Sequence, residues 1–249
     1  MPTFWQAVMQ YAKRAIFRLP IVRNLMLPRY PFMLEPDQLI WLCDAIDRTR
    51  ASGGIGCIVE VGVARGQTSA FLLTHMCHRG DSRRYYCIDT FQGFMPADVA
   101  HEISNRGKGS LSFGGFAVND RGLVEQNLQR QGFGNAAVIQ SDAGAFDWSS
   151  LPPIDVMLID VDLYRPTKAV LANSQPHGSP FARVMVDDVK TGTVYDGAEQ
   201  AYAEFCKERG FPLRPVGGKA GVIVAGEAIQ DAARGTLGIA PHSQSTAMR

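Results

Sequence analysis

The sequence predicts an α/β fold: a Rossmann-like, mostly parallel sheet of seven strands, with helices on both faces and an antiparallel C-terminal hairpin. Two observations predict it. Between residues 57 and 209, short apolar runs alternate with amphipathic stretches of helical length, a pattern typical of parallel sheets covered on both faces. The last two apolar runs, 213–216 and 222–225, are joined by a short glycine-rich linker, as in a β-hairpin.

The first 52 residues are expected to form an N-terminal helical segment, a lid or dimer contact. Residues 4–18 place apolar side chains at helical spacing and Lys13, Arg14 and Arg18 on the other side, and no acidic residue precedes Glu35. Such a helix can pack on its own domain, join two copies of the chain in a homo-oligomer, or lie on an anionic membrane through residues 1–30. A second helix is expected at 36–51, because Pro36 suits a first helical turn.

Residues 53–226 are expected to form the main domain, and each element follows from its local pattern. Apolar runs predict the first five strands, and helical periodicity predicts the helices between them. The expected strands are 57–61, 85–90, 136–140, 155–159 and 183–186, and the expected helices are 66–77, 118–131, 166–174 and 196–209. Residues 93–116 form a long Gly-rich connection, and 227–249 a flexible tail.

Composition excludes several classes of protein. The 249 residues carry a net charge of +1, so no strong basic field indicates a nucleic-acid partner. The five cysteines include no Cys-x-x-Cys pair and indicate reduced thiols in a cytoplasmic protein. No apolar run reaches the ~18 residues that span a bilayer, and the N-terminus lacks the pattern of a signal peptide.

The strongest local motif is Ile58-Val-Glu-Val-Gly-Val-Ala-Arg-Gly-Gln-Thr-Ser69, a strand that enters a glycine turn and then a helix. Gly62 and Gly66 let the backbone approach a ligand closely. Glu60, at the strand end, could hold the cationic amino group of S-adenosylmethionine (SAM), while Thr68 and Ser69 could cap the helix or bind a carboxylate. The spacing Gly-x-x-x-Gly does not match the dinucleotide fingerprint.

Two further strands end in acids that could bind the rest of such a cofactor. Asp89 ends the second strand, where a carboxylate can accept hydrogen bonds from both ribose hydroxyls of an adenosine. Asp142 follows the third strand and could accept one from the adenine amino group. Either acid could instead cap a loop or a helix.

The fourth and fifth strands both run directly into carboxylates. Asp160 and Asp162 follow one strand, and Asp187 and Asp188 follow the other. Converging carboxylates repel each other unless a cation neutralises them, and Mg²⁺ prefers such oxygen ligands. We therefore expect a metal site that lowers the pKa of a bound hydroxyl, although Asp residues also cap helices and turns.

These motifs together resemble the macrocin and mycinamicin type of sugar O-methyltransferases. The matching segments are Val59–Gly66, Ile88–Phe94, Ile159–Thr167, Val186–Val189 and Gly197–Phe205, in that order. The resemblance implies SAM and Mg²⁺ as cofactors, a sugar hydroxyl as acceptor, a homo-oligomer, and Asp160, Asp187 and Asp188 as metal ligands.

The sequence leaves more than one candidate for the acceptor and for the general base. Asp160, Asp187 and His101 are the candidate catalytic residues, His101 as a base within 93–116. A catechol-like or lipid-linked glycan acceptor is an alternative to a sugar-bearing small molecule. An NAD-dependent oxidoreductase on a similar sheet is a second alternative, and it would leave the paired acids unexplained.

Overall fold

The structure is a computed structural model that describes residues 4–20, 29–109, 113, 116 and 118–226. The chain forms two units, Met1–Met33 and Leu34–Arg249, which we describe separately. The predicted tail 227–249 lies outside the described residues.

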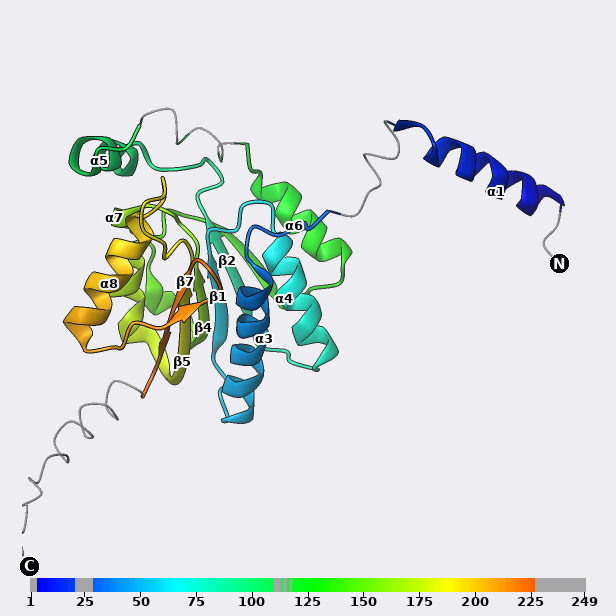
Figure 1. Ribbon diagram of the computed structural model, residues 1–249. Helices are drawn as coiled ribbons and strands as arrows, with labels where there is room; N and C mark the ends of the chain where they lie inside the picture. Colours follow the sequence, from blue (N-terminus) through cyan, green and yellow to red (C-terminus); the bar gives the residue numbers. More distant parts are fainter. Residues whose placement is uncertain (1–3, 21–28, 110–112, 114–115, 117, 227–249) are drawn as a thin grey trace, which may run out of the picture. The chain divides into compact units, whose positions relative to one another are not determined.

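The larger unit is built on one seven-stranded sheet with the order β3-β2-β1-β4-β5-β7-β6 (Figure 1). The strands are β1 (Cys57–Val61), β2 (Tyr85–Asp89), β3 (Ala136–Gln140), β4 (Ile154–Ile159), β5 (Gly178–Val186), β6 (Pro215–Val216) and β7 (Ala220–Val224). The first five strands are parallel, and β7 runs antiparallel to both β5 and β6. The predicted fold class and hairpin are confirmed.

Helices cover both faces of this sheet. The described helices of this unit are α3 (Pro36–Ala51), α4 (Gln67–His78), α5 (Pro96–Arg106), α6 (Arg121–Arg130), α7 (Tyr164–Ser174) and α8 (Gly197–Arg209), with short 3-10 turns η2 (Trp148–Ser150) and η3 (Gln175–His177). Of these, α5 lies beyond the ends of the strands (Figure 1). Figure 1 shows α3, α4 and α6 on one side and α7 and α8 on the other. The helix α3, grouped with the N-terminal segment in the sequence analysis, contacts β4, β5 and α4 within the larger unit.

The helix α5 lies inside the segment 93–116, for which the sequence pattern predicted a long Gly-rich connection and no helix. Pro96 stands in its first turn, and Gly107 ends it in the left-handed conformation with φ 69°, as is common at helix C-termini. The abundance of glycine in this segment hid these two helix signals.

The side chains of β1 alternate between two buried layers. Val59 and Val61 belong to the apolar core beneath α7 and α8, together with Tyr202 and Phe205. Glu60, on the opposite face, hydrogen-bonds to α4. The strand is therefore buried along its whole length, which explains its near-continuous apolar sequence.

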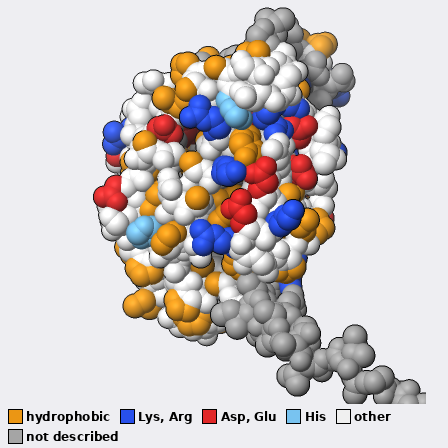
Figure 2. Space-filling view, turned by 90° about the vertical axis from the view of Figure 1, so that its left-hand side faces the viewer, with side chains coloured by type: hydrophobic (Ala, Val, Ile, Leu, Met, Phe, Trp, Pro, Cys, Tyr) orange, Lys and Arg blue, Asp and Glu red, His pale blue; other side chains and the backbone are white. Residues whose placement is uncertain are grey.

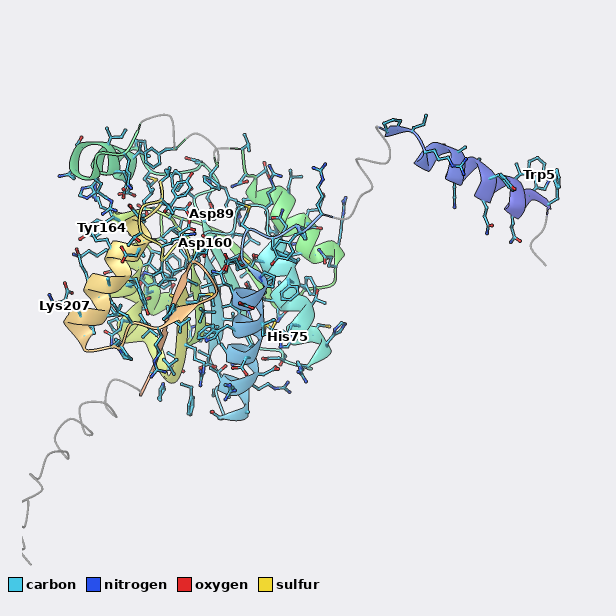
Figure 3. The ribbon with its side chains drawn as sticks, viewed as in Figure 1. Trp5, His75, Asp89, Asp160, Tyr164 and Lys207 are labelled. Carbon is cyan, nitrogen blue, oxygen red and sulfur yellow. The ribbon has the colours of Figure 1, made fainter. Side chains whose placement is uncertain are left out.

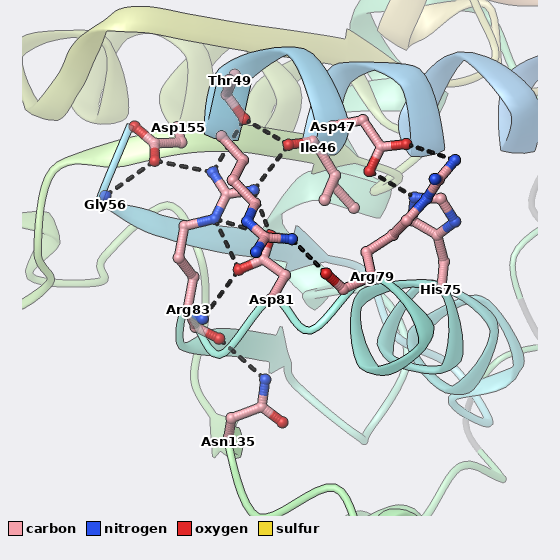
Figure 4. A network of polar contacts seen from close by, with 11 residues as sticks. Ile46, Asp47, Thr49, Gly56, His75, Arg79, Asp81, Arg83, Asn135 and Asp155 are labelled. Atoms are coloured by element: carbon pink, nitrogen blue, oxygen red, sulfur yellow. Dashed lines mark hydrogen bonds and ion pairs between the residues drawn. The ribbon is translucent and has the colours of Figure 1, made fainter. Parts of the chain in front are cut away.

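A buried ionic network ties the amino ends of the strands to α3 (Figure 4). Arg83 donates to Asp81 at 2.6 Å, to Asp155 at 3.0 Å and to the Thr49 hydroxyl at 2.9 Å. Asp155 also accepts from the Gly56 amide at 2.8 Å. The Arg83 side chain is only 7% exposed and that of Asp155 is fully buried, so each charge depends on its partners.

The smaller unit contains α1 (Phe4–Phe17). Its large apolar side chains are exposed, including Phe4, Trp5, Met9, Tyr11 and Ile16. In the part of the chain that the structure describes, no helix has the length and apolar character needed to cross a membrane.

Candidate active site

The acids predicted at the strand ends lie along one edge of the sheet, because hydrogen bonding continues past the strands. The Asp160 amide donates to Val61 at 2.8 Å, and the Asp187 amide donates to Ile159 at 2.9 Å. Asp89 ends β2 and Asp160 follows β4, the two strands that flank β1, so both residues lie at the carboxyl end of the sheet (Figure 3). We call this edge the rim.

Backbone strain is concentrated at the rim. Four described residues other than glycine have positive φ angles: Ala64 (50°), Phe91 (53°), Asp162 (61°) and Asp188 (55°). Each lies two or three residues beyond the end of a parallel strand. A left-handed conformation is costly for a side chain with a Cβ and tends to persist at functional sites, so the rim is the candidate active site.

The two glycines of the motif are required by the backbone. Gly62 has φ 88°, and a Cβ there would lie 1.7 Å from the Asp160 carbonyl oxygen. Gly66 has φ 76° at the start of α4, where a Cβ would lie 3.0 Å from a Val124 methyl group. Gly62 allows the loop after β1 to pass close to the loop after β4, and Gly66 allows the start of α4 to lie close to α6. Contact of these glycines with a cofactor stays a prediction.

Asp89 holds this glycine loop in place. One carboxylate oxygen accepts from the Val63 amide at 2.7 Å and the Ala64 amide at 2.9 Å, and the other accepts from the Phe91 amide at 2.7 Å. Asp89 therefore fixes the turns after β1 and β2, and its role in binding ribose stays a prediction.

Glu60 is buried on the α4 side of the sheet. Its Oε2 accepts from the Ser69 hydroxyl and from the Tyr85 hydroxyl, both at 2.6 Å. Burial raises the pKa of Glu60 to about 7, although these two hydrogen bonds oppose the shift. The structure thus brings the predicted residues Glu60 and Ser69 together, while Thr68 is half-buried in the same first turn of α4.

Asp142 and His101 occupy other parts of the site. The Asp142 carboxylate accepts from the Gly144 amide at 2.9 Å and closes the turn after β3. His101, on α5, stacks on the Tyr164 ring with a centroid separation of 5.6 Å. Because Tyr164 begins α7 immediately after the acidic residues, His101 lies next to the loop that carries them.

The four acids that follow β4 and β5 come together. Burial, together with the neighbouring Asp187 and Asp162 carboxylates, raises the pKa of Asp160 well above its ordinary value. Burial and the adjacent Asp188 do the same to the pKa of Asp162. The predicted convergence of carboxylates at the rim is therefore present.

Two residues in this cluster escaped the sequence analysis. Lys219, between β6 and β7, contacts Asp187 at 2.6 Å and Asp188 at 3.2 Å. Gln38, on α3, donates to the other oxygen of Asp187 at 2.6 Å. Among the described residues, no group of three or more His, Cys, Asp or Glu side chains is arranged to hold a metal ion.

An aromatic cluster borders the acidic residues. Phe94 lies 5.3 Å from Phe116 and 6.0 Å from Phe113 between ring centroids, and Tyr195 lies 6.2 Å from Phe116. Burial raises the pKa of Tyr195, and the Asp162 and Asp188 carboxylates add to the shift. No sequence pattern predicts this cluster, because Phe94 precedes α5, Phe113 and Phe116 follow it, and Tyr195 lies about 80 positions further along the chain.

The helix α5 is anchored beside these groups. Glu102, 1% exposed, accepts from the Tyr164 amide at 2.8 Å and from Arg106 at 2.8 Å. Arg106 and Lys108 each contact Asp196 at 2.6 Å. Figure 2, which views the molecule from the left-hand side of Figure 1, shows acidic and basic side chains intermixed on that face. These contacts fix the ends of α5, α7 and α8 to one another.

Comparisons with known proteins agree with this geometry. A family model described as a methyltransferase domain matches residues 59–189. The chain is 28% identical over 147 residues to 8-demethyl-8-(2,3-dimethoxy-alpha-L-rhamnosyl)-tetracenomycin-C 4'-O-methyltransferase of Streptomyces olivaceus; the match covers 57% of this chain and spans only 56% of that relative.

Two solved structures have a similar fold. The O-methyltransferase NovP matches with a TM-score of 0.61 and 17% identity, over 79% of this chain and 83% of its own. The calicheamicin methyltransferase CalS11 matches with a TM-score of 0.61 and 19% identity, over 91% of this chain and 95% of its own.

Proposed function

Because the chain belongs to this methyltransferase domain family, whose members' fold implies SAM as the methyl donor, we propose that it methylates a hydroxyl oxygen of a sugar-bearing small molecule. The observation that carries the proposal is the rim itself, where carboxylates adjoin the glycine loop on one side and the aromatic cluster on the other. The Streptomyces olivaceus relative, named for methylation of a rhamnosyl group, supports a sugar acceptor.

We propose that SAM lies along the ends of β1, β2 and β3. Gly62, Gly66 and Thr68 would bind its methionine part, since the left-handed glycines lack a Cβ and let a ligand approach the loop closely. Asp89 would bind the ribose and Asp142 the adenine amino group. Glu60 and Ser69 are bonded to each other, so we assign them mainly to positioning α4 and the loop.

Methyl transfer needs little covalent chemistry from the protein. SAM supplies a sulfonium methyl group that is already electrophilic; the bond from carbon to sulfur breaks as the bond to the acceptor oxygen forms. The protein aligns the two partners and excludes water. The hydroxyl proton must pass to a base, for which His101 on α5 stays the candidate.

We keep Asp160 and Asp187 as the proposed catalytic residues, because their carboxyl groups lie at the rim and can hydrogen-bond to the hydroxyl of an acceptor bound there. The predicted requirement for Mg²⁺ at Asp160, Asp187 and Asp188 is the part of the hypothesis that the arrangement supports least. Both oxygens of Asp187 already have donors, Gln38 and Lys219. A divalent ion there would have to displace the Lys219 ammonium, so as arranged these residues do not fit the ion.

The aromatic cluster and the carboxylates suit a sugar acceptor, and the relative named for methylation of a rhamnosyl group favours a sugar over a catechol. Apolar faces of a sugar can pack on aromatic rings, while carboxylates accept hydrogen bonds from its hydroxyl groups. A catechol-like or lipid-linked glycan acceptor stays an alternative. The NAD-dependent oxidoreductase is no longer one, since the family match identifies a methyltransferase.

Two measurements test this proposal. Calorimetry should show binding of SAM and of its demethylated product, but not of NAD. The Asp89→Asn variant should weaken SAM binding at least tenfold, whereas Asp147→Asn, which changes an exposed acid in the turn before η2, should not. Transfer of labelled methyl groups should then favour rhamnosides over catechols; preference for a catechol would refute the acceptor class.

The N-terminal unit keeps both of its predicted partners as proposals. The exposed aromatic and aliphatic side chains of α1 suit either an anionic membrane surface or a second copy of the chain. A cytoplasmic location is likewise still a prediction, consistent with the free thiols of the five cysteines.

A further inference from the structure

Lys219 stands inside the acidic cluster, and the sheet fixes its position. Val186 of β5 pairs with Gly221 of β7, and the Lys219 carbonyl accepts from the Val189 amide at 2.7 Å. The backbone of Lys219 is thus attached to the chain immediately after Asp187 and Asp188. Its ammonium group contacts both carboxylates, at 2.6 and 3.2 Å.

The ammonium group of Lys219 is held against these two carboxylates in a largely enclosed place. The side chain is 22% exposed, and that of Asp187 only 2%. The ion pair is therefore largely withdrawn from solvent. Charge-assisted hydrogen bonds are stronger in such surroundings than in water.

The same geometry conflicts with a divalent ion at this place. A metal bound by Asp187 and Asp188 would need the place beside both carboxylates that the Lys219 ammonium group occupies, and Gln38 contacts the other oxygen of Asp187. The ion and the ammonium group would also repel each other at close range. A divalent ion and the Lys219 ammonium group therefore compete for the same place beside these carboxylates.

We propose that Lys219 is the resident cation of this site, replacing the divalent ion predicted at the same carboxylates. Lys219 balances the charge of the carboxylates and holds Asp187 in place for the acceptor. It is a positioning residue that acts through the carboxylates it contacts. Methyl transfer by this chain then requires no divalent ion. The claim that methyl transfer requires no divalent ion rests on the proposed function, whereas the claim that Lys219 takes the place of the ion does not.

Manganese binding tests the site without any methyl acceptor. Full-length protein is titrated with Mn²⁺, and free Mn²⁺ is followed by its electron paramagnetic resonance signal. The wild type should bind no stoichiometric Mn²⁺ over the range of the titration. The Lys219→Met variant should bind one ion with a dissociation constant at least tenfold below the upper end of that range, and excess Mg²⁺ should displace it. Lys219→Arg, which keeps the charge, should behave as the wild type.

Two controls make the result interpretable. Circular dichroism establishes that each variant is folded, and if Lys219→Met does not fold, Lys219→Gln takes its place. The double variant Lys219→Met/Asp187→Asn should lose the new Mn²⁺ site, which would assign the ion to these carboxylates. Stoichiometric Mn²⁺ binding by the wild type, or no gain of affinity in the folded lysine variant, would overturn the proposal.

Turnover provides a second measurement once an acceptor is identified. Wild-type turnover should be unchanged in excess chelator, and Lys219→Met should be slow and partly rescued by added Mg²⁺. Abolition of wild-type turnover by the chelator would contradict the proposal. If no acceptor is methylated at all, the proposed function fails while the Mn²⁺ result still decides the role of Lys219.

Discussion

The carboxyl group of Glu60 predicts an unusual dependence of stability on pH. Its ordinary pKa of 4.5 is raised to about 7 in the folded chain. Between these two values the folded state holds a proton that the unfolded state has lost, so the free energy of unfolding falls as pH rises. One pKa unit corresponds to about 1.4 kcal/mol, so the shift predicts a loss of about 2 to 3 kcal/mol between pH 5 and pH 8.

Substitution isolates this contribution from the other titrating groups. The Glu60→Gln variant keeps an oxygen that accepts from Ser69 and Tyr85 but carries no charge. Urea unfolding of the wild type and the variant at pH 5 and pH 8 gives four free energies of unfolding. Relative to the wild type, the variant should be about 2 to 3 kcal/mol more stable at pH 8 than at pH 5. Glu208→Gln, on the exposed end of α8, controls for the loss of one negative charge.

A stability difference between wild type and Glu60→Gln that is equal at the two pH values would refute the reasoning. It would show that Glu60 titrates alike in the folded and unfolded chain. The Tyr85→Phe variant provides an independent check, because loss of a donor at 2.6 Å should raise the pKa of Glu60 further and move the pH-dependent window upward.

Three other predictions concern the rest of the molecule. Arg83→Met should lower the free energy of unfolding by about 3 to 5 kcal/mol, since it leaves the buried Asp155 without its cation; the exposed Arg48→Met should cost less than about 1 kcal/mol, and equal losses would contradict this. Gly62→Ala should weaken SAM binding by calorimetry at least tenfold, because its Cβ has no space, and unchanged affinity would argue against a rigid loop. Vesicles containing phosphatidylglycerol, but not phosphatidylcholine alone, should shift the fluorescence of Trp5 to shorter wavelength; a Trp5→Ala control assigns the signal, and no shift with either vesicle would favour contact between copies.

The layered fold was predictable because local pattern and tertiary burial agree. The buried strands β1 and β4 are almost entirely apolar, and the hairpin linker is glycine-rich. The helix α5 was missed because its boundary signals, Pro96 and Gly107, are single residues within a segment that otherwise resembles a loop.

The part of the candidate site that consists of carboxylates at strand ends was predictable from the sequence. Asp160, Asp187 and Asp188 follow apolar strands, and parallel strands bring their carboxyl ends to one edge. Lys219 lies in a turn, and its neighbours emerge only when the pairing of Val186 with Gly221 is extended by two residues. Gln38 gave no signal, since nothing in an amphipathic helix marks one polar residue as buried against a carboxylate 149 positions away.

The buried network around Arg83 stabilises the fold at a distance from the candidate active site. It fastens β1, β2, β4 and α3 at the pole of the sheet opposite the rim. Connections at the other pole can therefore be lengthened, shortened or exchanged between relatives without loosening that clamp. For protein engineering, grafting a foreign α5 segment in place of residues 93–116 is a practical route to new acceptors on an unchanged scaffold.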